Sequence, residues 1–168
     1  MREHNRDRGR LEDILKYAKN VEQIVNGISY EQFVADIRIY YSVMKNVEVI
    51  GEAANMLTRH FREEHNELPW RLIVSMRNVL VHGYAQVSDA DLWQTATNDI
   101  KPLSEQVQQY IDDIDWEQWA QREDPYTEID NAGYKQAVES ALRMKTKGYA
   151  VADIAEITGL TAEEIERL

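Results

Sequence analysis

The spacing of apolar residues constrains the fold of this chain more than any other feature. They recur every three or four residues along most of the sequence, which is the spacing of one face of an α-helix. The first such stretch contains Leu11, Ile14, Leu15, Ala18, Val21, Ile24 and Val25. Only 7 glycines and 3 prolines interrupt 168 residues. The sequence therefore predicts an all-α fold.

Four main helices follow from this pattern and from the residues that start and stop helices. We expect them at residues 8–26 and 29–62, from Pro69 to a stop at Gly83, and from a cap at Ser88 to residue 114. The loops between them are short, which favours a four-helix bundle.

Three positions inside these helices predict particular geometry. Ser29 followed by Gln32 forms a capping-box pattern at the start of the second helix. Gly51 lies in the middle of that helix, where glycine costs up to about 1 kcal/mol relative to alanine, so we expect a close helix crossing there. Pro102 should interrupt and kink the fourth helix.

The bundle is expected to span residues 1–114, followed by two further segments. Residues 115–131 are acidic and aromatic, with Trp116 and Trp119, and are interpreted as a linker with partial helix. Residues 132–168 are expected to form a small helical appendage. It should contain one helix at 132–147 and then two short helices around Thr158-Gly159, the second of them capped by Thr161.

Composition and charge narrow the possible function classes. The chain has no cysteine, which excludes disulfides and thiolate sites and is typical of a reducing cytosol. No apolar run approaches the roughly 18 residues that span a bilayer, so we expect a cytoplasmic protein without membrane association. The net charge is −11, of which residues 111–168 carry −8. Nucleic-acid binding would have to depend on a local positive site.

The end of the third helix holds the residues most suited to chemistry. Arg77 is a permanent cation with a donor fork that matches phosphate, and His82 can exchange a proton near neutral pH. Five residues of helix place the two about 140° apart around the axis, whereas Asn78 and His82 share a face. A joint site then needs a groove around the helix end or two subunits, which favours a symmetric dimer.

RNA cleavage needs a base, a cation beside the phosphate and an acid, because the substrate supplies its own 2′-hydroxyl nucleophile. Arg77 and His82 match these roles in kind, without a metal or a cofactor. Taken alone, however, an arginine and a histidine in a helix are more often a surface ion-pair partner and a helix-end cap.

The segment Arg77 to Tyr84 resembles the R-x4-H-x-Y signature of HepT-like toxins in the HEPN ribonuclease superfamily. Further blocks of the resemblance occur in the same order over residues 8–114. They are Leu11 to Leu15, Asn46 to Ala54, Leu68 to Arg71, Met76 to Asn78, and Trp93 to Leu103. Several separate blocks make the resemblance far more specific than the short motif.

The resemblance implies a dimeric HEPN bundle, possible higher assembly, and metal-independent RNA cleavage by Arg77 and His82 with Asn78 in support. It also implies a toxin–antitoxin pair in which a nucleotidyltransferase antitoxin of the MntA type transfers AMP to Tyr84. An AMP group would add negative charge and bulk beside the cationic site. The alternative is an inactive interaction module that binds such a nucleotidyltransferase. DNA binding by the tail is disfavoured, because its last helix carries Glu163, Glu164 and Glu166.

Overall fold

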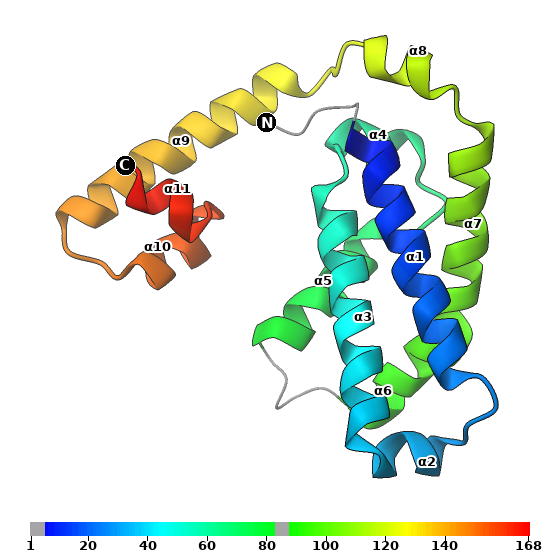
Figure 1. Ribbon diagram of the computed structural model, residues 1–168. Coiled ribbons are helices and arrows are strands. Elements are labelled where there is room, and N and C mark those ends of the chain that lie inside the picture. Colours follow the sequence, from blue (N-terminus) through cyan, green and yellow to red (C-terminus); the bar gives the residue numbers. More distant parts are fainter. Residues whose placement is uncertain (1–5, 83–87) are drawn as a thin grey trace. The chain divides into compact units, whose positions relative to one another are not determined.

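The computed structural model describes residues 6–82 and 88–168, with the side chains of His82 and of residues 127–131 excepted. Every regular element in these residues is a helix, which confirms the all-α fold (Figure 1). They form two compact units, one that ends at Glu123 and one formed by Asp124–Leu168. Within this part of the chain, no helix combines the length and the apolar character needed to cross a membrane.

The first unit is built on α1 (Asp7–Val25), α3 (Ile37–Met56), α5 (Trp70–His82) and α7 (Ile100–Asp113). Figure 1 shows α1 between α3 and α7, and α3 also packs against α5. The face of α1 predicted from periodicity is the buried one: Leu11, Ile14, Ala18 and Val21 are all 0% exposed. Burying a side chain of the leucine or isoleucine class contributes roughly 1.5–3 kcal/mol.

The prediction of one continuous helix from Ser29 to Arg62 is wrong, because the segment forms three helices. They are α2 (Tyr30–Ala35), α3 and α4 (Arg59–Glu64). The capping box of Ser29 and Gln32 is confirmed. Asp36 ends α2 in an extended conformation and caps α3, since its carboxylate accepts from the Arg38 backbone N–H. A side chain that binds a nearby amide competes with helix continuation, and apolar periodicity does not reveal it.

The second break, at Leu57 and Thr58, is enforced by a buried carboxylate from α1. Asp7 is 1% exposed and accepts from the backbone N–H and from the hydroxyl of Thr58, both at 2.7 Å. The same hydroxyl accepts from the Phe61 N–H and so caps α4. A buried carboxylate is tolerated only when it is hydrogen-bonded. Asp7 therefore links the start of α1 to the start of α4.

The fourth predicted helix is interrupted just before Pro102, as expected. It comprises α6 (Asp89–Gln94), a π-helical turn (Thr95–Asp99) and α7. The Ile100 N–H donates to the Thr95 carbonyl, five residues back. Proline has no N–H to donate and its ring conflicts with the carbonyl four residues earlier, so a wider turn at this position accommodates it.

Part of the segment interpreted as a linker packs into the first unit. It forms α8 (Trp116–Gln121), whose Trp119 is 2% exposed and lies against Phe61. The Trp119 indole N–H donates to the Asp7 carboxylate at 3.1 Å. Trp119 is therefore a core residue and is not available for base stacking. This packing explains why the unit extends to Glu123.

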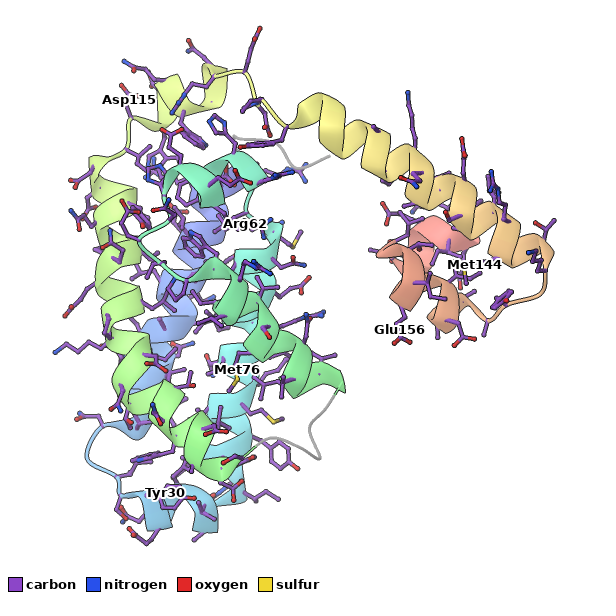
Figure 2. All side chains as sticks on the ribbon, turned by 180° about the vertical axis from the view of Figure 1, so that it is seen from behind. Tyr30, Arg62, Met76, Asp115, Met144 and Glu156 are labelled. Carbon is purple, nitrogen blue, oxygen red and sulfur yellow. The ribbon has the colours of Figure 1, made fainter. Side chains whose placement is uncertain are left out.

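The second unit has a small core of its own. It consists of α9 (Thr127–Thr146), α10 (Val151–Thr158) and α11 (Ala162–Glu166), packed around Ala141, Ile154, Leu160 and Ile165. The two short helices predicted around Thr158-Gly159 are confirmed. Gly159 adopts φ +71°, which suits glycine at a helix end, and Thr161 caps α11. Figure 2 shows the side chains of both units from behind.

Candidate active site

Arg77 lies on α5 where that helix crosses α3 at Gly51. A Cβ placed on Gly51 would lie 2.3 Å from the Arg77 Cβ and 3.0 Å from the Ile73 carbonyl oxygen. Only a residue without a side chain permits this approach. The close crossing predicted from Gly51 is therefore confirmed, and the residue that it brings against α3 is the predicted catalytic arginine.

Two polar neighbours hold the Arg77 guanidinium. Its Nε is 3.0 Å from the Glu52 Oε2, and its Nη1 donates to the Asn78 Oδ1 at 3.0 Å. The Nε and Oε2 atoms are both buried and do not meet in hydrogen-bond geometry, so they interact as charges. The arginine side chain as a whole remains 26% exposed. Among the described residues, Nη2 has no partner, which leaves donors for an anionic ligand.

Asn78, the predicted supporting residue, therefore contacts Arg77 directly. It is exposed and accepts from Nη1, whereas Glu52 faces Nε. Glu52 on α3 and Asn78 on α5 thus contact the guanidinium from two helices.

His82 is the last described residue of α5. Its side chain lies outside the described residues, and so does the whole of Tyr84. A joint site formed by Arg77, His82 and Tyr84 therefore stays a prediction. What the backbone establishes is that Arg77 and His82 belong to one continuous helix, with His82 at its C-terminus.

Sequence reasoning missed Glu52 as the partner of Arg77. The signal was present, because Glu52 follows Gly51, the residue that predicted the crossing. What remained unknown was which helix crosses there. Among the described residues, no group of three or more histidine, aspartate or glutamate side chains is arranged to hold a metal ion.

Comparison with known proteins assigns the first unit to a family. The family described as ribonuclease HepT-like matches residues 14–110. A candidate RNase of Caldanaerobacter subterraneus subsp. tengcongensis is 37% identical over 101 residues, which are 60% of this chain and 90% of that protein. A protein named as ribonuclease HepT from Thermococcus cleftensis is 36% identical over 93 residues, 55% of this chain and 84% of its own.

A third relative, a candidate RNase of Methanocaldococcus jannaschii, is 33% identical over 98 residues, covering 58% of this chain and 90% of that protein. No solved structure matches the chain significantly. The family match includes α3 and α5 and therefore Glu52, Arg77, Asn78 and His82. This chain belongs to the HepT-like ribonuclease family of the HEPN superfamily.

Proposed function

We propose that this protein is a metal-independent RNA endonuclease that acts as the toxin of a toxin–antitoxin pair. The observation that carries the proposal is the setting of Arg77, in a chain of this ribonuclease family. Its guanidinium is fixed by Glu52 and Asn78, retains donors for a phosphate, and lies on the helix that ends at His82. We propose that it acts in the cytoplasm, where a toxin would meet cellular RNA.

The reaction is a transesterification within the RNA chain. A base, for which we propose His82, removes the proton of the 2′-hydroxyl, and the 2′-oxygen attacks the adjacent phosphorus. The bond to the 5′-oxygen breaks, and an acid returns a proton to that oxygen. Arg77 stabilises the negative charge that develops on the phosphate oxygens. A histidine can serve as base or acid near neutral pH.

We further propose that the first unit is a HEPN four-helix bundle that works as a homodimer. The exposed apolar side of α5 supports this. Leu72 is 69% and Val79 is 40% exposed, and seven residues of helix place them on one face. A symmetric pair of α5 helices would bury this face and bring two copies of the motif together. The residues after Glu123 would form an appendage of this unit.

The proposed partner is a nucleotidyltransferase antitoxin of the MntA type that transfers AMP to Tyr84. The motif places Tyr84 two residues after His82. An attached AMP would add a phosphodiester charge next to the arginine and would repel the RNA backbone. This mode of control requires no change in the fold of the nuclease.

Cleavage of a labelled RNA by the purified chain in excess EDTA tests the proposal. We expect His82→Ala and Arg77→Ala each to lower the rate by about 10²–10⁴. Arg8→Ala is the matched control, because Arg8 is an exposed arginine of the same unit whose one ion pair with the described residues is to Glu12, along α1. It should cleave at the rate of the unchanged protein. Equal activity in His82→Ala would reject the proposed role of His82, and no cleavage by the unchanged protein would favour the inactive interaction module.

A further inference from the structure

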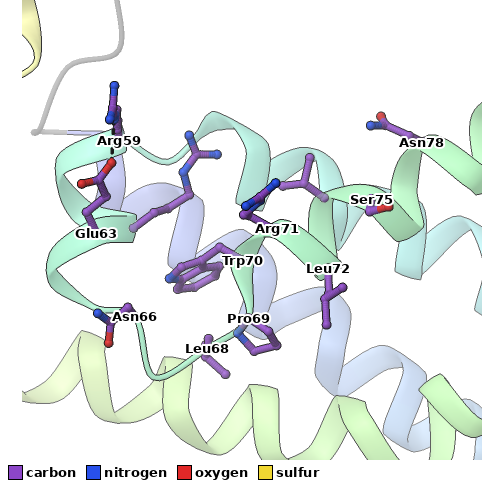
Figure 3. A pocket seen from close by; sticks show the side chains of 12 residues that line it. Arg59, Glu63, Asn66, Leu68, Pro69, Trp70, Arg71, Leu72, Ser75 and Asn78 are labelled. Carbon is purple, nitrogen blue, oxygen red and sulfur yellow. Dashed lines mark hydrogen bonds and ion pairs between the residues drawn. The ribbon is translucent and has the colours of Figure 1, made fainter.

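A large cavity lies beside the candidate active site, between α4 and the outer side of α5. Its volume is about 850 Å³, within the range typical of ligand pockets. Figure 3 shows its walls, with Arg59 and Trp70 at one end and Ser75 and Asn78 at the other. Arg71 lies between them. Arg62 also lines the cavity. All of these residues belong to the first unit.

The cavity is cationic in a strongly acidic protein. Of the described residues, three arginines and one glutamate, Glu63, line it, a net of two positive charges, whereas the whole chain carries −11. Arg59 is paired with Glu63, with 2.6 Å between Nε and Oε1. Arg62 directs Nη1 to the Asn55 carbonyl at 3.5 Å, a long contact. Arg71 is exposed and makes no hydrogen bond or ion pair with the described residues.

The cavity leads to the arginine of the candidate active site. Arg71, Ser75 and Asn78 occupy positions i, i+4 and i+7 of α5, so they form one polar stripe along the helix. Seven residues of α-helix span about 10 Å. At the far end of the stripe, Asn78 accepts a hydrogen bond from Arg77. In the helical register, His82 follows Asn78 by one further turn.

We propose that this cavity binds the RNA backbone next to the cleaved phosphate, with Arg71 as the main phosphate contact and Arg62 as the second. This inference rests on the proposed function, because it takes RNA to be the substrate. The Arg71 guanidinium has no partner among the described residues, and such a group suits a phosphate. Trp70 is 4% exposed and its indole N–H is bound to the His65 carbonyl, so it offers no face for base stacking. The cavity therefore suits backbone phosphates rather than a base stacked on Trp70.

This arrangement explains how an acidic chain can bind RNA. The overall field of the protein repels a polyanion, so the binding free energy must come from a few local contacts. Each phosphate contact releases condensed counterions and contributes about 0.7 to the slope of log affinity against log salt for single strands.

Binding of a fluorescent single-stranded RNA to the full chain carrying His82→Ala, followed by anisotropy, tests the inference without cleavage. We compare Arg71→Gln with Lys101→Gln, which removes the same charge from an exposed position of α7 outside the cavity. Titrations between about 50 and 200 mM salt give the slope. Arg71→Gln should weaken binding about tenfold and reduce the slope by about 0.7, whereas Lys101→Gln should change neither. Arg71→Lys should keep the slope.

Equal affinity and slope in all variants would overturn the inference. Arg71-dependent binding of 5′-AMP or inorganic phosphate, together with RNA affinity that does not depend on Arg71, would also overturn it, since the cavity would then be a site for a small anion. If RNA binding depends on Arg71 but the protein with His82 intact does not cleave RNA, the result would support RNA binding in the cavity and reject the proposed nuclease activity. The two proposals thus fail separately.

Discussion

The contact between Gly51 and Arg77 allows a quantitative prediction for Gly51→Ala. Because a Cβ is fixed to the backbone, neither partner can rotate away from the 2.3 Å approach of the new methyl to the Arg77 Cβ. Carbon atoms in contact lie about 3.5–4.0 Å apart. The crossing of α3 and α5 would have to widen by roughly 1.2–1.7 Å from the present 2.3 Å.

The expected stability change is the balance of two effects. Overpacking a tight core costs about 1–3 kcal/mol, and the absence of a rotamer that relieves this clash places it at the upper end. Alanine returns about 1 kcal/mol as a better helix former. We therefore expect Gly51→Ala to lower the free energy of unfolding by about 2 kcal/mol. It should also lower cleavage by about 10²-fold, because a displacement of about 1 Å at a reacting group has that effect.

Urea unfolding followed by circular dichroism measures the stability change. Gly9→Ala is the matched control, since Gly9 is also helical, lies in the same unit, and has nothing within 4 Å of a Cβ placed on it. It should be neutral or more stable by up to about 1 kcal/mol. If Gly51→Ala were as stable as Gly9→Ala, the reasoning from the helix crossing would be refuted, whether or not the protein cleaves RNA.

Two further predictions concern Glu52 and His65. Glu52→Gln removes the charge that faces the Arg77 Nε at 3.0 Å. We expect its kcat for RNA cleavage to fall about tenfold with little change in KM, and we expect Glu52→Asp to restore part of that kcat. An unchanged kcat in Glu52→Gln would exclude a positioning role for Glu52. Burial lowers the pKa of His65 below its ordinary value of 6.5, although Glu64 and Glu67 oppose the shift. The unfolded chain then binds this proton more readily, so the free energy of unfolding should decrease as the pH falls below 6.5. Urea titrations from about pH 8 to about pH 5.5 should show a smaller decrease in His65→Gln, and an equal decrease would exclude His65 as its source.

Local rules predicted most of the helices, because apolar spacing and capping are properties of neighbouring residues. The buried face of α1, the capping box at Ser29 and the Thr161 cap follow from spacing and side-chain chemistry within one or two turns. The breaks at Asp36 and Thr58 did not follow, since the apolar stripe continues through both. The carboxylate that enforces the second break comes from Asp7, 51 positions earlier in the chain.

For the candidate site, too, some features followed from the sequence and others only from the tertiary structure. The sequence by itself determined an all-helical chain and the order Arg77, Asn78, His82 and Tyr84 at the end of one helix. Only the tertiary structure decided that Glu52 faces that arginine, because the crossing at Gly51 brings together two helices that are separate in the chain. It also decided that Arg59, Arg62 and Arg71 line one cavity. Helix periodicity records which face is buried, whereas the partner of that face depends on packing among distant segments.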